Sequence, residues 1–441
     1  MAAVFDRVST TWQSFLGVTF QCVQCHGHPY DPISQREYYA FLDYLNHTED
    51  EDRDDDTPRI AVERAGVATS VPVMRERTGD ARRTTRRLER GALTAPAEAV
   101  EAGIPAALGQ PAVREQPAVR EPPAVLGLVR DVPRDRLEMA RWVASADNPL
   151  FARVAANRAW ETLFGRGIVE TSEDFGVMGS GASDQALLDH LAGVLVARGF
   201  SMKALLREIV TSATYRQSSA ASPEALAKDP DNRLWSRAPR LRLESEQIRD
   251  QALAVSGLLS RKMGGPPVMP PQPEGVWQVV YSGDAWQTSQ GEDRYRRAIY
   301  TFLRRTSPYP SFLAFDATSR ETCTVRRIRT NTPLAALVTL NDPVYLECAQ
   351  ALAVSVRGET DDASAVRAML AAAILREPGD DEVARLAELA TTERARYAGR
   401  EDLARVLAGR AAEGSDDLAR DAGRVAAANA ILNLDDFLTR W

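Results

Sequence analysis

Two cysteines and a histidine near the N-terminus have the spacing of a covalent haem attachment site. Cys22 and Cys25 are separated by two residues, and His26 follows directly. In c-type haem attachment the two thiols add to adjacent vinyl groups of the porphyrin, and the histidine after the second cysteine binds the iron. The motif therefore predicts that Cys22 and Cys25 carry haem c covalently and that His26 is the proximal iron ligand.

Because this motif is short, the same residues also fit other chemistry. Cys22, Cys25, His28 and His47 supply the two thiolates and two imidazoles of a tetrahedral zinc site, although the histidines are further apart than in a zinc finger. A redox-active cysteine pair is a third interpretation, but no βαβ pattern surrounds the motif. A purely structural role is the fourth. The spacing alone leaves these interpretations open.

The sequence does not define the second axial ligand of such a haem. His28 lies too close to His26 to reach the opposite face of the same iron. The candidates are His47, His190, one of the eight methionines, or a position left open or filled by water.

A second group of polar residues lies between Asp316 and Asn331, within an otherwise apolar stretch. Its members are Asp316, Arg320, Cys323, Arg326, Arg327, Arg329 and Asn331. Arginine binds carboxylate and sulfate groups well, so the group could form an anion pocket or the active site of a hydrolase. We favour a third interpretation, in which these arginines form ion pairs with Glu244, Glu246 and Asp250.

Composition limits the classes of protein to which the chain can belong. Its 441 residues are enough for several domains, and 44% are hydrophobic and 26% charged, as in ordinary globular proteins. The net charge of −7 argues against nucleic acid as a partner, because that requires clustered, unopposed basic residues. No stretch reaches the roughly 20 apolar residues of a transmembrane helix. The remaining cysteines, Cys323 and Cys348, are expected to be buried and reduced.

Changes in composition divide the chain into three regions. Residues 1–48 hold the cysteine motif, residues 49–133 are an acidic and Pro-rich linker with short strands, and residues 134–441 are mainly helical. Acidic residues fill seven of the eight positions 49–56, and proline recurs through 110–125, which are patterns of solvated, extended chain.

Local signals predict the elements of the linker and of the helical region. Alternating residues at 59–63 and 69–74 indicate a strand pair. Helix starts are predicted at Asn148-Pro149, Ser183, Ser201, Thr332-Pro333 and Asp342-Pro343. The first of these helices is expected to end at Phe164, before Gly165. The alanine-rich residues 363–437 indicate a closing helical bundle.

One interval interrupts the helical pattern. Residues 264–276 are rich in glycine and proline, and they lead into the β-prone segments 276–281 and 297–303. The predicted fold is therefore mainly α, with helical bundle domains, a small β-hairpin insertion and a Pro-rich linker.

Motifs along most of the chain resemble two planctomycete domains. Residues 15–33, with Cys-x-x-Cys-His-x-His before Tyr30-Asp31-Pro32, and the run Tyr38–Leu42 are similar to the cytochrome c-like domain of the second type (PSCyt). Later motifs resemble the companion PSD domain that follows it. These are Asn148-Pro149-Leu150, Asn157-Arg158, Phe164–Gly167, Asp174-Phe175-Gly176, Thr211–Arg216, Thr324–Arg327, Asn331–Leu334 and Asn433–Phe437.

The resemblance implies an exported protein, periplasmic or at the cell surface, that binds haem. It suggests electron transfer to or from an unknown redox partner, with a link to polysaccharide breakdown, but it implies no particular reaction. Family members usually begin with a signal sequence and the first half of the cytochrome c-like domain, whereas this chain has no signal peptide and opens shortly before Cys22. It therefore resembles an N-terminally truncated member. The alternative is a non-redox binding or structural module with a Cys/His zinc site.

Overall fold

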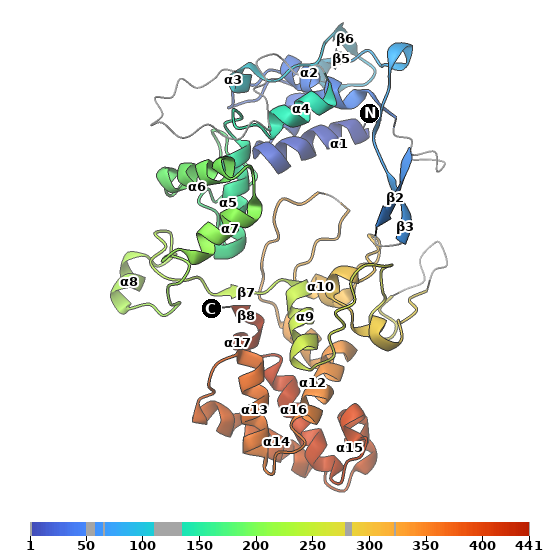
Figure 1. Ribbon diagram of the computed structural model, residues 1–441, viewed down its shortest axis with the longest axis vertical. Coiled ribbons are helices and arrows are strands. Elements are labelled where there is room, and N and C mark those ends of the chain that lie inside the picture. Colours follow the sequence, from blue (N-terminus) through green and yellow to red (C-terminus); the bar gives the residue numbers. More distant parts are fainter. Residues whose placement is uncertain are drawn as a thin grey trace. The chain divides into compact units, whose positions relative to one another are not determined.

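A computed structural model describes residues 2–49, 58–64, 67–109, 135–277, 285–321 and 323–440. The chain divides into two compact units, Met1–Pro239 and Arg240–Trp441. Helices dominate both units, and the strands of the described residues form only two-stranded antiparallel sheets, which confirms the mainly α prediction (Figure 1). The division at 239 falls inside the region 134–441 that composition had grouped together. No helix among the described residues is long and apolar enough to span a membrane.

The first unit begins with helices packed around an aromatic core. Helix α1 (Ala2–Thr11) continues into a π-helical turn (Trp12–Leu16), and it packs beside α2 (Gln35–Asn46). Trp12 stacks on Phe20 with 3.9 Å between ring centroids, and both side chains are fully buried. Aromatic rings bury large apolar areas, so this core fixes the segment between the two helices.

Short strands follow α2 in the region predicted as a linker. The strands β1 (Thr48–Glu49), β2 (Arg59–Arg64), β3 (Val67–Pro72), β4 (Arg75–Glu76), β5 (Arg86–Leu88) and β6 (Pro96–Ala99) pair as β1–β4, β2–β3 and β5–β6. The β2–β3 pair is the predicted hairpin, with Ile60 opposite Val71. The short helix α3 (Ala106–Gly109) comes next. The proline repeat at 110–125, and the acidic run after Glu49, lie outside the described residues.

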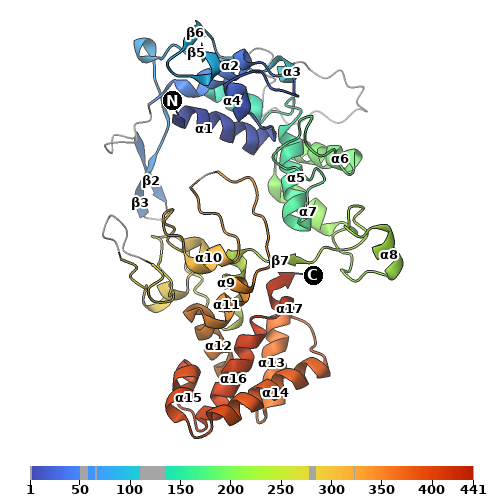
Figure 2. The same cartoon turned by 180° about the vertical axis from the view of Figure 1, so that it is seen from behind.

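The rest of the first unit is helical. It contains α4 (Arg136–Val143), α5 (Phe151–Phe164), α6 (Gln185–Ala197), α7 (Met202–Thr211) and α8 (Pro223–Lys228). Figure 2 shows α5, α6 and α7 together, and their apolar faces form one core. Ser201 caps α7 as predicted, and α5 ends at a left-handed Gly165. The predicted cap at Ser183 is wrong by one residue, because the carboxylate of Asp184 accepts from the backbone N–H of Leu187.

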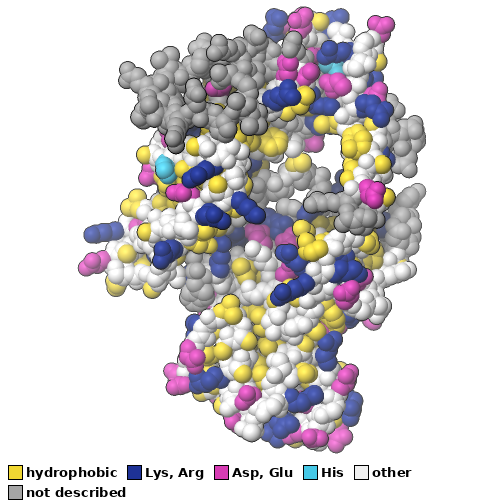
Figure 3. Space-filling view, viewed as in Figure 1, with side chains coloured by type: hydrophobic (Ala, Val, Ile, Leu, Met, Phe, Trp, Pro, Cys, Tyr) yellow, Lys and Arg dark blue, Asp and Glu magenta, His cyan; other side chains and the backbone are white. Residues whose placement is uncertain are grey.

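The second unit is a helical bundle closed by a strand pair. Its elements are β7 (Leu241–Arg242), α9 (Ser245–Val255), α10 (Pro310–Ala314), α11 (Pro333–Asn341), α12 (Pro343–Ser355), α13 (Asp362–Ile374), α14 (Asp380–Tyr397), α15 (Glu401–Ala408), α16 (Leu418–Ile431), α17 (Asp435–Leu438) and β8 (Thr439–Arg440). Both Pro-initiated helices and the closing bundle are confirmed. Figure 3 shows acidic and basic side chains mainly along the margins of this bundle's visible face, with hydrophobic and uncharged groups between them.

The predicted hairpin of 276–281 and 297–303 is wrong for its second segment. Ala298–Tyr300 forms a 3-10 turn, and most of the first segment lies outside the described residues. The backbone N–H of Ala298 donates to the Asp250 carboxylate over 2.6 Å. The guanidinium of Arg296 lies over the Tyr300 ring, 3.7 Å from its centroid. The tertiary contact with Asp250, together with the local packing of Arg296 on Tyr300, overrides the β-propensity of the segment.

Candidate functional site

Cys22 lies in the 3-10 turn Gln21–Gln24 (η2), Cys25 directly follows it as the C-cap residue, and both cysteines are free and exposed. The backbone N–H of Cys25 donates to the carbonyl of Cys22 over 3.2 Å, which closes the turn. Residues i and i+3 lie one above the other in a 3-10 turn, so this geometry brings Cys22 and Cys25 close together. Val23, between them, is fully buried in the aromatic core. The sequence thus anchors the turn through Val23 and leaves Cys22 and Cys25 exposed.

Hydrogen bonds from α2 hold this turn in place. The carbonyl of Gln24 accepts from Gln35 Nε2 and from the Tyr39 hydroxyl, each at 3.0 Å. Gln35 Nε2 also donates to the Leu88 carbonyl over 2.9 Å, which ties the turn to β5. Burial raises the pKa of Tyr39 to about 12, so its hydroxyl stays a neutral donor at physiological pH. Sequence reasoning missed Gln35 and Tyr39, because only the folded chain brings them to Gln24.

A second turn packs against the cysteine pair from the side of β5. In the 3-10 turn Glu89–Gly91, a Cβ placed on Gly91 would come 2.8 Å from Cys25 Sγ. Gly91 also has a φ of +71°, so both space and backbone conformation favour glycine there. Burial raises the pKa of the Cys22 thiol, so this group is more fully protonated than a free cysteine at neutral pH.

His26 is exposed, and its ring orientation is set by the next residue. His26 Nδ1 lies 2.6 Å from the carbonyl oxygen of Gly27. A carbonyl can only accept a hydrogen bond, so Nδ1 carries a proton, and in the neutral imidazole Nε2 then keeps its lone pair. A metal-binding histidine is typically oriented in this way, with one nitrogen donating to a carbonyl and the other facing the metal. The two cysteines and His26 therefore fit covalent haem with Nε2 as iron ligand.

The structure does not bring the predicted zinc ligands together. His28 Nδ1 accepts the backbone N–H of Asp31 at 2.8 Å, within its own loop. His47 lies buried at the end of α2, where its Nε2 is 3.1 Å from a carboxylate oxygen of Asp43. Eight residues of helix, about 12 Å, separate His47 from Tyr39, which contacts the cysteine turn. This pair could have been predicted from the sequence, because residues four apart on a helix lie on the same face, and Asp43 and His47 have that spacing.

Across the described ranges, no group of three or more His, Cys, Asp or Glu side chains is arranged to hold a metal ion. Among the other residues singled out by sequence, His190 is exposed on α6. Cys348 is buried as expected, but Cys323 is exposed, which corrects the prediction for that residue.

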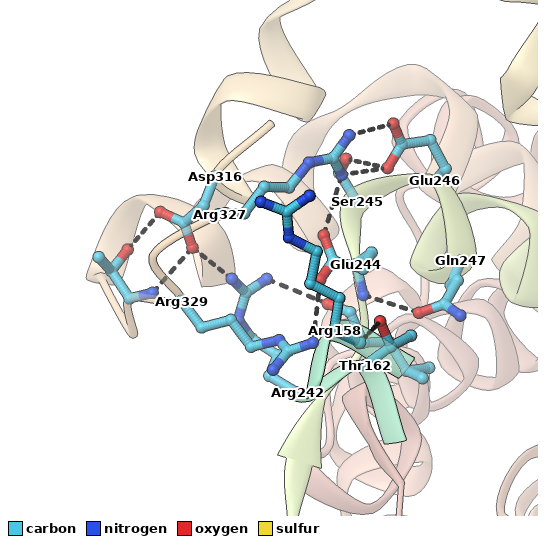
Figure 4. Close-up of polar contacts among 12 residues, drawn as sticks. Arg158, Thr162, Arg242, Glu244, Ser245, Glu246, Gln247, Asp316, Arg327 and Arg329 are labelled. Carbon is cyan, nitrogen blue, oxygen red and sulfur yellow. Dashed lines mark hydrogen bonds and ion pairs between the residues drawn. The ribbon is translucent and has the colours of Figure 1, made fainter. Parts of the chain in front are cut away.

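The arginines of the polar group at 316–331 form ion pairs with Glu244 and Glu246, as favoured from the sequence (Figure 4). The prediction is wrong for Asp250, which pairs with Arg297 instead. Arg327 donates to both oxygens of Glu246 at 2.6 and 2.8 Å, and to Glu244 at 2.9 Å. Arg329 donates to the other Glu244 oxygen at 3.0 Å. Burial alone would raise the pKa of Glu246, but hydrogen bonds from Arg327 and Ser245 outweigh burial and lower it to about 2.

The remaining acids near this group are also used internally. Asp316 accepts from the backbone N–H and the hydroxyl of Thr330 at 2.8 and 2.6 Å, and it pairs with Arg242. Asp250 accepts from Ala298 and pairs with Arg297 at 3.3 Å. The contacts of Asp316 with Arg242, and of the loop arginines with Glu244 and Glu246, fasten the loop 316–331 to β7 and α9, so the group acts as a structural network.

Comparison with known families agrees with the resemblance seen in the sequence. The family model PSD1, protein of unknown function (DUF1553), matches residues 135–390, and the chain belongs to this family. The model PSCyt2, protein of unknown function (DUF1549), matches residues 1–50, which include the turn with Cys22, Cys25 and His26. Neither the curated proteins nor the solved structures include a significant match to the chain.

Proposed function

We propose that this protein is an exported c-type haem protein with a role in electron transfer. In this proposal Cys22 and Cys25 form the thioether bonds, and His26 Nε2 is the proximal ligand of the iron. Bound haem supplies one-electron chemistry, while the chain supplies attachment and orientation. Because haem attachment to thiols takes place after export, we place the protein in the periplasm or at the cell surface.

The observation that supports the proposal most is the orientation of the three residues. Both cysteines are exposed and lie three residues apart, in one tight turn and at its C-cap, which is the spacing that attachment to adjacent vinyl groups needs. His26 donates from Nδ1 to Gly27, so its Nε2 lone pair is available to iron. The Val23 anchor and the bonds from Gln35 fix the turn, so little ordering is needed on attachment.

The partner and wider process follow from the family resemblance. We propose a redox partner protein that exchanges electrons with the haem, in connection with oxidative breakdown of polysaccharides. The rival zinc module requires His28 and His47 beside the cysteines, whereas His28 Nδ1 is occupied by Asp31 and His47 Nε2 faces Asp43. The experiment that tests haem attachment therefore also measures zinc, so that it distinguishes the two interpretations.

The test is to export the chain into the periplasm of a host that carries c-type haem maturation machinery. We expect a Soret band that survives acid–acetone extraction in the wild type and is absent from the variant Cys22→Ala/Cys25→Ala. The matched control is Cys323→Ser, which removes an exposed thiol outside the motif and should keep the band. Stoichiometric zinc with no Soret band, and loss of structure on chelation, would favour the zinc module instead.

A further inference from the structure

The segment that carries the cysteine motif is fixed at both of its ends by three consecutive residues of a distant loop. We infer that Phe175, Gly176 and Val177, here called the clamp, are positioning residues for the turn with Cys22 and His26. The consequence for haem rests on the proposed function. The contacts that make up the clamp all lie within the first unit.

The clamp holds the segment before the motif at Gly17. The backbone N–H of Phe175 donates to the Gly17 carbonyl over 2.6 Å. A Cβ on Gly17 would come 2.8 Å from the Phe175 ring and 2.9 Å from Val154, and Gly17 has a φ of +60°. The chain can therefore approach the Phe175 ring this closely only with glycine at position 17.

The clamp holds the segment after the motif at Asp31. The backbone N–H of Val177 donates to Asp31 Oδ1 over 2.9 Å. A Cβ on Gly176 would come 2.4 Å from Asp31 Oδ2, so only glycine leaves room for this carboxylate. The Asp31 side chain is only 11% exposed, which makes the amide of Val177 an important partner for its charge.

Local hydrogen bonds carry this constraint from Asp31 back toward His26. The Asp31 N–H donates to His28 Nδ1 at 2.8 Å, and the His28 N–H donates to the Ile33 carbonyl at 2.8 Å. The loop after His26 is thus closed on itself and fastened to the clamp through one carboxylate. Residues 17 and 31 are both fixed, so the turn between them has little freedom to rotate.

The clamp also links the two matched family segments. Gly17 and Asp31 lie within residues 1–50, and the clamp lies within residues 135–390. Arg158 adds a further bond across the same boundary, because its Nη2 donates to the Gln13 carbonyl over 2.6 Å. The orientation of His26 therefore depends on residues of the PSD1 segment, and so would the reduction potential of a haem bound to it.

Two variants on opposite sides of the contact test this inference. Gly176→Ala puts a methyl group into the Asp31 carboxylate, and Asp31→Ala removes the acceptor of the Val177 N–H. In the full chain without haem, each should raise hydrogen exchange of the amides 22–33 about tenfold, and the double variant should add little. The control is Gly181→Ala in the same loop region, where an added Cβ meets nothing within 4 Å. Unchanged exchange in both variants would overturn the clamp.

A second readout uses the haem-loaded protein. Both variants should shift the midpoint potential relative to wild type and Gly181→Ala, while Asp31→Asn, which keeps an acceptor for Val177, should shift it less. Faster exchange with an unchanged potential would overturn the positioning role. If wild type carries no haem, the proposed function fails, and the exchange measurement alone decides whether the clamp holds the turn.

Discussion

Two groups of residues in this chain have side chains that could take part in chemistry, and they differ in whether those side chains are exposed or paired with one another. The segment with Cys22, Cys25 and His26 leaves all three residues exposed, and only Nδ1 of the imidazole is paired with the neighbouring Gly27 carbonyl in the described contacts. In the network of Glu244, Glu246, Arg327 and Arg329 (Figure 4), carboxylate and guanidinium groups instead bind one another.

The comparison shows that the density of polar residues is a poor guide to function. Each charge of the network is paired with another charge of the same network. These ion pairs therefore stabilise the contact between the loop 316–331 and α9. The cysteine turn has fewer functional groups, but their reactive atoms are not used by the fold. Substitutions should therefore change stability in the network and ligand binding at the turn.

The largest loss of stability should come from Arg327→Ala. It leaves the partly buried Glu244 and Glu246 without their shared partner, and we expect the second unit to lose about 3 kcal/mol. Hydrogen exchange in α9 of the full chain measures this loss. The matched control is Arg396→Ala, which removes a two-thirds exposed arginine from a surface pair and should change stability by less than about 0.5 kcal/mol. Equal losses of stability in Arg327→Ala and Arg396→Ala would contradict a structural role for the network.

A smaller effect of opposite sign is expected at Asp342, which is buried at the start of α12. Burial raises its pKa to about 6, against the hydrogen bond from Val344 and the charge of Arg249. The folded state then holds this proton while the unfolded state loses it, so stability falls as pH rises from about 4 to 6. Asp342→Asn removes that loss and should stabilise the protein at pH 7 by about 2 kcal/mol, with no gain at pH 4. Thermal unfolding at the two pH values measures the difference.

Glu246 is the control for Asp342, because its pKa is shifted in the opposite direction and its effect on stability should have the opposite pH dependence. Its pKa is lowered to about 2, so its contribution is present above the unfolded pKa and is lost as pH falls through about 4 to 2. Glu246→Gln should therefore destabilise the protein at pH 7 and lose its effect near pH 2. A stabilising effect of Glu246→Gln at pH 7 would contradict the structural role of the network.

The smallest effect on stability should come from the residues with the proposed chemistry. The thiols of Cys22 and Cys25 are exposed, so the double alanine variant without haem should unfold within about 0.5 kcal/mol of wild type. Denaturant unfolding of both proteins, prepared without haem maturation, measures this. A large loss would mean that the cysteines are structural, which was one interpretation left open by the sequence.

The sequence predicted those parts of the fold that depend on neighbouring residues. Thr332-Pro333, Asp342-Pro343 and Ser201 mark helix starts because capping and the fixed φ of proline act within one turn. The strand predicted at 297–303, as half of a hairpin with 276–281, is wrong because Asp250 holds that segment through a tertiary contact that propensity does not contain.

The residues of the candidate site could be proposed from the sequence, but the contacts that support them could not. The spacing of Cys22, Cys25 and His26 points to these residues, because the proposed haem attachment depends on local spacing. The contact between the clamp and Asp31 could not be predicted from the sequence, because Asp31 and Val177 are 146 residues apart and only the folded chain brings them together. That His47 does not lie with the other predicted zinc ligands could be predicted in part, because Asp43 precedes it by one helical turn and can pair with it.

The most direct test of the central claim is the intact mass of the exported chain under denaturing conditions. Denaturation releases haem that is only coordinated, so any remaining mass increase reports covalent attachment. The account predicts a mass increase of one haem in wild type and in Cys323→Ser, and none in Cys22→Ala/Cys25→Ala. An unmodified mass for the wild type, from a host that matures another c-type cytochrome normally, would contradict it.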